Sequence, residues 1–374
     1  MSVGLLILGL VLFVLLVVVH EFGHFIVARH NGVDAEEFGI FFPPRIWSRI
    51  TKKGWRFSIN AIPIGGFVRL KGESDSATGS HTYGGASLWV KTKILLAGII
   101  MNFLAAFVLL MVLAWVGMPQ LVNKQYTVKS DTSTIKNEVF AGNIISGSPA
   151  ASIGLNFNDR LISITPLKGK AEFITSDMGL PKITKNLAGQ IVSLEYSQNN
   201  QTFTKTVHLL SLKTVAASQK TKNPKGYLGI SPYQYKLKRS TWSAPIVAGG
   251  LLWQFITLTF HGLGTAIMGL VHGNATQASS QLTGPVGIYE ILKNGSSLGY
   301  QFILIFIAVI SLSLAIMNLL PIPVLDGGKL FLTVGARLFR KKLSENLEAL
   351  LYGTSFALLM LLLVLITISD VHKH

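Results

Sequence analysis

Two histidines with a glutamate between them are the residues of this chain best placed to do chemistry. His20 and His24 are four residues apart, so on a helix both imidazoles project from one face and can share a metal ion. Glu21 can hold a water molecule bound to that metal and take its proton. Two imidazole ligands, a Lewis-acidic ion and a carboxylate base together predict a zinc-dependent hydrolase with Glu21 as its catalytic base.

The segment that carries this motif has the composition of a membrane span. Val3 to Val19 contains no polar side chain, and apolar residues resume after the motif. A helix over 3–28 is about 39 Å long, more than the roughly 30 Å hydrocarbon core of a bilayer. A lone histidine in a span can simply bond to a neighbouring helix. Two histidines at helical spacing with a glutamate between them favour a metal site, because ionisable groups at this depth are costly and usually functional.

The composition of the whole chain agrees with a membrane protein. The 374 residues are 49% hydrophobic and only 13% charged, and Cys is absent. No disulfide or Cys-ligated metal is therefore possible. The net charge of +16 is better explained by membrane topology and anionic lipid than by nucleic acid, which we do not expect as a partner. The N-terminus lacks a basic stretch and a cleavage site, so we expect a retained span rather than a signal peptide.

We predict a polytopic α-helical membrane protein with four transmembrane helices. The expected spans are 3–28, 94–118, 300–320 and 350–368. The polar region between the first two has an excess of Lys and Arg, which places it in the cytoplasm by the positive-inside rule. Both chain ends then lie outside the cytoplasm, and the two histidines lie toward the cytoplasmic side. Residues 244–271 are apolar but interrupted by polar side chains, so we expect an amphipathic interfacial segment within 240–299.

A β-hairpin region is expected on the cytoplasmic side over residues 35–72. Alternating apolar residues predict one or two hairpins, with breaks at Pro43-Pro44, Lys53-Gly54 and Gly65-Gly66. The region is either an ordinary loop with some β-structure or an edge strand beside the metal that holds unwound substrate by strand addition. The second interpretation makes Gly65 and Gly66 candidates for substrate binding.

Two further polar residues stand at membrane depth. Asn102 follows Gly98 in the second span, where its amide either bonds to another helix, supports the metal site or holds the substrate backbone. The third span ends at Pro321 and Pro323, which cannot continue a helix, and Asp326 follows. Asp326 is either a turn residue or the third metal ligand. We favour the ligand, because the histidine pair lacks one and few acids lie near a span.

Residues 120–239 predict an extracytoplasmic α+β domain. The run 144–164 reads as a strand, a short helix after Ser-Pro-Ala, a Gly turn and a second strand. It resembles the PDZ signature, with Asn158 where that family usually has Gly. Strands at 191–196 and 203–210 would complete the domain. PDZ domains bind peptide ends by β-augmentation, but this one could equally bind nothing and only obstruct.

Together these motifs resemble the site-2 protease family of intramembrane metalloproteases, in the bacterial branch with an extracytoplasmic PDZ domain. The matching positions are the His-Glu-x-x-His motif, Gly98-x-x-x-Asn102, Gly65-Gly66, the Gly-Pro-Val-Gly at 284–287 and the run from Asn318 to Gly327. The resemblance implies one zinc ion, the bacterial cytoplasmic membrane, and Asn318 as another substrate-binding candidate. It also implies a single-pass membrane-protein substrate, such as an anti-sigma factor or a signal-peptide remnant, trimmed beforehand by another protease.

The expected activity is therefore that of a zinc metalloendopeptidase cutting within or near a substrate's transmembrane segment. His20, His24 and Asp326 would bind the zinc, and residues 1–119 and 300–374 would form the two halves of the protease core. The alternative is a catalytically silent, PDZ-bearing membrane scaffold or metal carrier. Glu21 argues against it, because a site that only binds metal gains nothing from a water-activating base.

Overall fold

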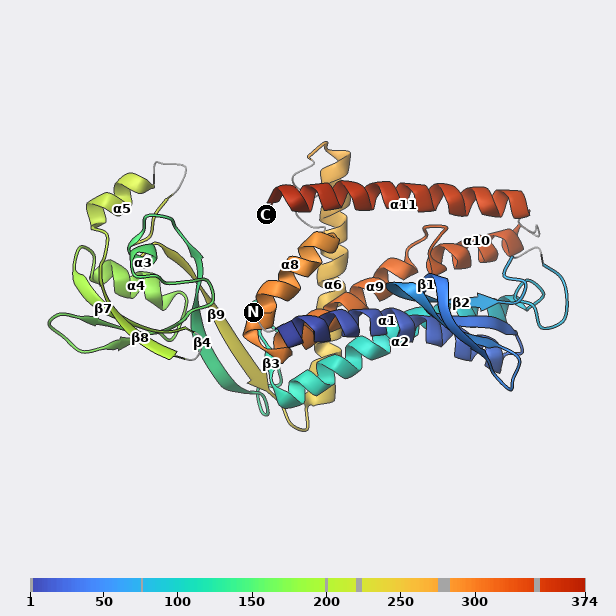
Figure 1. Ribbon diagram of the computed structural model, residues 1–374, viewed down its shortest axis with the longest axis horizontal. Helices are drawn as coiled ribbons and strands as arrows, with labels where there is room; N and C mark the ends of the chain where they lie inside the picture. Colours follow the sequence, from blue (N-terminus) through green and yellow to red (C-terminus); the bar gives the residue numbers. More distant parts are fainter. Residues whose placement is uncertain are drawn as a thin grey trace. The chain divides into compact units, whose positions relative to one another are not determined.

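The computed structural model describes residues 3–74, 77–198, 201–219, 224–274, 283–339 and 344–373. The chain forms two compact units. One consists of Met1–Ala114 with Ser243–His374, and the other of Trp115–Trp242. The first is built mainly of long helices with a β-hairpin, and the second is rich in β-strands (Figure 1). Part of the predicted interfacial segment, 275–282, lies outside the described residues.

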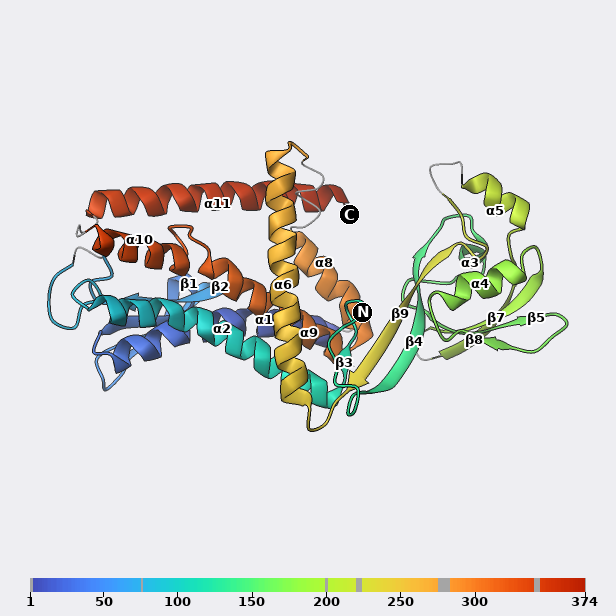
Figure 2. The same cartoon turned by 180° about the vertical axis from the view of Figure 1, so that it is seen from behind.

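Within the described residues, five helices are long and apolar enough to cross a membrane. They are α1 (Val3–His30), α2 (Leu88–Val116), α6 (Ala244–Val271), α9 (Tyr300–Leu319) and α11 (Glu345–Lys373). Four of them coincide with the predicted spans. The fifth, α6, is one continuous helix over the range predicted to lie at the interface, and it lies across the direction of α1 and α11 in Figures 1 and 2. The count of four spans stays a prediction, whereas the helices fit a multi-pass membrane protein.

Close approach of α1 and α2 depends on a glycine. A Cβ at Gly23 would lie 2.7 Å from both the Ala97 carbonyl oxygen and the Met101 Cγ, so only glycine allows this spacing. On another side, α1 packs against α8 (Pro285–Gly295) and α9 through a buried apolar cluster. The buried members of this cluster are Leu6, Leu16, Leu292, Ile303 and Ile307. These contacts fix α1 between α2 on one side and α8 and α9 on another.

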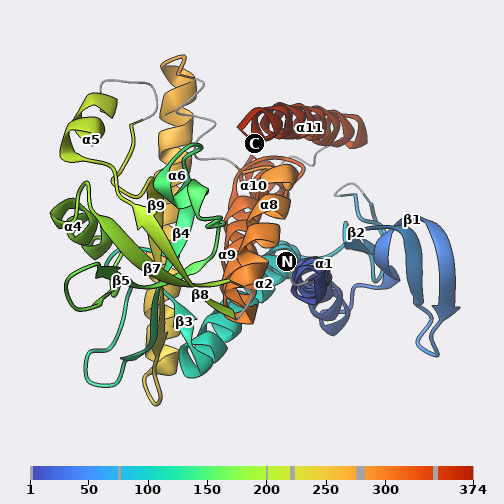
Figure 3. The ribbon, with the colours of Figure 1, turned by 60° about the vertical axis from the view of Figure 1, so that its left-hand side comes forward.

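The hairpin consists of β1 (Ala35–Ile50) and β2 (Arg56–Leu70), which pair antiparallel around a turn at 51–55. Figure 3, which looks nearly along α1, shows it on one side of α1 and α9 on the other. The expected strand ends at Pro43-Pro44 and Gly65-Gly66 are wrong, because both pairs lie inside strands. Each strand bends there instead. Residues 37–40 have register partners in both 56–59 and 66–69, so the hairpin folds back on itself and its last segment forms one edge.

The segments on either side of α9 differ from the sequence prediction. Within 240–299, expected to be an amphipathic interfacial segment, the short helix α8 begins at Pro285. The buried Asp370 carboxylate accepts hydrogen bonds from the N–H groups of Gly284 (2.8 Å) and Gly287 (3.1 Å). After α9 the chain makes a short turn and then forms α10 (Asp326–Leu338), a helix that the sequence pattern did not predict. Asp326 therefore stands at the first position of a helix, just beyond the end of a span.

The second unit has a sheet with strand order β3-β9-β4-β5-β7-β8, in which β6 pairs with β5. The strands are β3 (Met118–Pro119), β4 (Ser133–Ile144), β5 (Arg160–Pro166), β6 (Glu172–Phe173), β7 (Ile191–Gln198), β8 (Gln201–His208) and β9 (Ile230–Arg239). The helices are α3 (Pro149–Ser152), α4 (Gly179–Asn186) and α5 (Leu212–Ser218). Ser148 caps α3 through the Ala151 N–H. Asn158 has a φ of 70°, a left-handed conformation that glycine and asparagine adopt most easily.

Candidate metal centre

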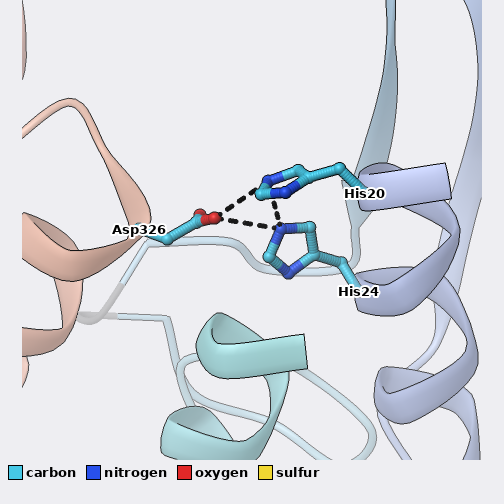
Figure 4. A group of neighbouring side chains, drawn as sticks. All are labelled: His20, His24 and Asp326. Carbon is cyan, nitrogen blue, oxygen red and sulfur yellow. Dashed lines mark hydrogen bonds and ion pairs between the residues drawn. The ribbon is translucent and has the colours of Figure 1, made fainter. Parts of the chain in front are cut away.

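Three side chains that are distant in sequence meet in the first unit. His20 and His24 lie one turn apart on α1, and Asp326 reaches them from the start of α10 (Figure 4). The Asp326 Oδ2 atom is 3.0 Å from His20 Nε2 and 3.2 Å from His24 Nε2. The two Nε2 atoms are 3.1 Å apart. Three possible ligand atoms, all within 4.8 Å of one another, therefore converge on one point.

The chemistry of this group fits a zinc ion. The Asp326 Oδ2 atom is buried and makes no hydrogen bond of acceptable geometry, although two ring nitrogens lie beside it. Buried carboxylate oxygens normally have a partner, and a cation between the three atoms would supply one. Two imidazole nitrogens and one carboxylate oxygen are a common zinc donor set, and three protein ligands leave one position for water.

Neighbouring groups orient both imidazoles. His24 Nδ1 lies 2.7 Å from the Ile94 carbonyl oxygen, which can only accept, so Nδ1 carries the proton and the lone pair of Nε2 faces Asp326. His20 Nδ1 lies 3.2 Å from the side-chain nitrogen of Asn102, whose buried Oδ1 has no partner. If the Asn102 amide is flipped, its Oδ1 takes the place of the nitrogen and accepts a hydrogen bond from the Nδ1–H of His20. That arrangement leaves His20 Nε2 free to bind a metal.

A missing side chain on α2 makes room for the two rings. A Cβ at Gly98 would lie 2.7 Å from His20 Nε2 and closer still to His24 Nε2. Real Cβ atoms essentially never approach other atoms so closely. The glycine therefore lets the backbone of α2 support both imidazoles directly.

The candidate base Glu21 lies beside this group and against β2. Its Oε2 atom accepts a hydrogen bond from the Val68 N–H at 3.1 Å. A cavity of about 780 Å³ opens onto Glu21, both histidines and Asp326, and it is also lined by Gly66, Phe67, Val68 and Asn318. The edge segment of the hairpin therefore forms one wall of the same cavity as the candidate metal ligands.

Two of the predicted substrate-binding residues lie elsewhere. Asn102 is buried behind His20 and does not line the cavity, so its position favours support of the metal site over the expected contact with substrate. Gly65 also lies outside the lining and has a φ of 70°, which an L side chain rarely adopts. Its position suggests that it serves the bend of β2. Gly66 and Asn318 stay candidates for substrate contact.

Sequence reasoning missed a polar group on the cavity wall. Glu348 on α11 accepts hydrogen bonds from Ser74 Oγ (3.0 Å) and from the Tyr352 hydroxyl (3.0 Å). Close by, Lys329 on α10 lies 3.5 Å from Glu73. All five residues line the cavity. The four-residue spacing of Glu348 and Tyr352 indicates a hydrogen-bonded pair on one face of a helix. The predicted span begins at 350, however, and therefore leaves Glu348 out.

Long apolar helices that bring two histidines, an aspartate and a glutamate together are typical of a membrane metallopeptidase. Comparison with known proteins agrees. The sequence model described as peptidase family M50 matches residues 8–362, so the chain belongs to this family, the site-2 proteases. A "Putative zinc metalloprotease" of Clostridium acetobutylicum is 31% identical over 99% of this chain and 98% of its own. The "Regulator of sigma E protease" of Haemophilus influenzae is 26% identical over 95% of this chain and 96% of its own. The chain is thus a metallopeptidase with zinc as its cofactor.

Proposed function

We propose that this protein is an intramembrane zinc endopeptidase that cuts single-pass membrane proteins within or near their transmembrane segments. The observation that carries this proposal is the meeting of His20, His24 and Asp326 beside Glu21 in one cavity. Regulated proteolysis is the corresponding biological role, in line with the name of the Haemophilus relative. An anti-sigma factor or signal-peptide remnant, trimmed first by another protease, is the expected kind of substrate.

Each residue of the cluster has a proposed role. His20, His24 and Asp326 hold the zinc, which when bound supplies Lewis-acid activation of water and of the substrate carbonyl. Glu21 takes the proton from the attacking water and passes it to the leaving amine. The Val68 N–H at 3.1 Å holds this carboxylate beside the ligands in the absence of substrate.

The hairpin edge is the proposed substrate cradle. A carbonyl inside a helix is already hydrogen-bonded, so the substrate must unwind before attack. The Val68 N–H points away from β1 toward Glu21, and by alternation along a strand Gly66 presents its backbone groups to the same side. An extended substrate can pair with this edge. A substrate carbonyl must then share the Val68 N–H with Glu21 or displace Glu21 from it. Displacement would release the Glu21 carboxylate for proton transfer.

Topology and the second unit complete the proposal. The cluster would lie toward the cytoplasmic side, both chain ends would be extracytoplasmic, and α6 would lie at the interface. The second unit would act outside the cytoplasm as a PDZ-like domain that gates substrates. The Ser148 cap and the left-handed Asn158 at the expected turn support a PDZ-like identity for this unit.

Glu21→Gln tests the enzyme assignment. We expect cleavage of reporter membrane proteins to fall by at least the ~10²- to 10⁴-fold typical of general-base removal, while zinc stays near one per chain. Glu36→Gln, at an exposed position of the hairpin, is the matched control and should cleave normally. Proteomics of membrane fragments that accumulate only with Glu21→Gln would identify substrates. Near-normal cleavage by the zinc-loaded Glu21→Gln protein would refute Glu21 as the catalytic base. A zinc-loaded wild-type protein that cleaves no reporter better than Glu21→Gln would favour the scaffold or metal-carrier alternative.

A further inference from the structure

A second cavity lies between α1 and α2, separate from the metal centre. Its volume is about 640 Å³, within the ~300–1,000 Å³ range of small-molecule sites. Its lining shares no residue with the cavity described above. The two helices that carry His20, His24 and Gly98 thus have a groove on another face.

The two ends of this groove differ in chemistry. Its inner part is apolar and includes Ile26, Ala97, Ile100 and Met101. Its other end lies where α1 ends and α2 begins, and is lined by His30, Asn31, Thr92 and Lys93. From Lys93 to Met101 the groove follows α2 for about 12 Å, most of the ~15 Å hydrocarbon thickness of one leaflet.

The charge of the polar end is positive. Lys93 is exposed, its Nζ atom lies 5.5 Å from the centre of the Trp89 ring, and no Asp or Glu is among the residues that line the groove. Trp89 is 67% exposed, as expected for an indole at headgroup level. The backbone N–H groups at the start of α2 add a partial positive charge at the same place.

We propose that this groove binds one anionic phospholipid. Its phosphate would lie against Lys93 and the start of α2, and an acyl chain would lie along Ala97 and Met101. A free anion would leave the apolar part empty, and an uncharged lipid would leave Lys93 without a counter-charge, so an anionic amphiphile matches both ends. Gly23 contacts α2 at the floor of the groove, so the lipid would brace the α1–α2 pair from outside.

Native mass spectrometry from nanodiscs tests the site. In discs of phosphatidylcholine with added phosphatidylglycerol, the wild-type protein should retain phosphatidylglycerol preferentially. Lys93→Gln should lower that preference about fivefold, corresponding to the ~1 kcal/mol contributed by one lysine near an anionic surface. Lys53→Gln removes the same charge from the exposed hairpin turn and should leave the preference unchanged. Equal losses in both variants, or none in Lys93→Gln, would overturn the proposal.

A thermal-stability measurement separates a lipid from a free anion. Phosphatidylglycerol should raise the melting temperature of the wild-type protein, because a ligand that binds only the folded state stabilises it. The gain should be smaller in Lys93→Gln, and it should disappear in Leu96→Trp, which fills the apolar part of the groove. Glycerol phosphate, the headgroup without chains, should give no gain. An equal gain from glycerol phosphate would overturn the lipid assignment, and neither readout depends on proteolysis.

Discussion

Gly98→Ala should damage the metal centre although the substitution adds only one methyl group. The new Cβ would lie 2.7 Å from both Nε2 and Cε1 of His20, and closer to Nε2 of His24. The backbone of a packed helix cannot easily withdraw, so the two imidazoles must move. Changes to the groups that orient metal ligands typically lower metal affinity about 10- to 100-fold, which is about 1.4–2.7 kcal/mol. We expect a loss of zinc affinity in this range.

The assay is zinc competition against a fluorescent chelator, with cleavage of a reporter substrate measured in parallel. Gly4→Ala is the control, because a Cβ at Gly4 meets nothing within 4 Å. That substitution should keep wild-type zinc affinity. A Gly98→Ala protein that binds zinc as tightly as the wild type would refute the idea that close packing of α2 holds the two imidazoles in position.

Two further predictions concern single side chains. Asn102→Leu should weaken zinc binding about 10- to 100-fold in the same competition assay, whereas Asn102→Asp keeps an acceptor for His20 Nδ1–H and should bind nearly normally; equal losses would contradict the orienting role. Burial alone would raise the pKa of Glu37, but hydrogen bonds from Ser58 and Arg45 and the Arg45 charge outweigh it and hold the pKa below its ordinary value. Because the folded pKa is lowered, this stabilisation is present above the ordinary Glu pKa and is lost as the pH falls through the lowered value. Limited proteolysis of the hairpin should show that loss, and Glu37→Gln should remove the pH dependence.

Regular elements with strong local patterns could be predicted from the sequence. The span at 3–28 appears as Val3–His30, because a long polar-free run has no other low-energy state in a bilayer. The strand expected at 191–196 appears as Ile191–Gln198. The bends of the hairpin could not be predicted, since they depend on β1 pairing with two segments of β2 at once. Long-range pairing of this kind leaves no periodic trace in the sequence.

The candidate site likewise has features that the sequence predicts and features that only the folded structure shows. Local helical spacing brings His20 and His24 together. The sequence favours Asp326 as the third ligand because the pair lacks one and few acids lie near a span, and this role stays a prediction. The bond from Val68 to Glu21 and that from His24 to the Ile94 carbonyl involve backbone groups, which every residue has. No residue type signals them, so only the fold can place them.

The direction of α9 constrains the number of membrane crossings. His24 lies near the end of α1 and Asp326 just after the end of α9, and the two are 3.2 Å apart. Both helices must then end on the same side of the membrane. Since α2 returns the chain to the opposite side, an even number of crossings must separate α2 from α9. Among the described helices between them, α8 has 11 residues, about 16 Å, which is too short for a ~30 Å core. We therefore expect α6 not to cross.

Cysteine labelling tests this expectation cleanly, because the chain has no Cys of its own. Trp242 and His272 flank α6 and are exposed. Cysteines at both positions should react with a membrane-impermeant thiol reagent in intact cells, since both ends of an interfacial helix face the same compartment. A cysteine at Ser344, just before α11, should react only after lysis. If 242 and 272 were labelled from opposite sides, α6 would be a fifth span and α9 would run the other way. Asp326 would then stand across the bilayer from His20, and it could not share a zinc ion with that histidine.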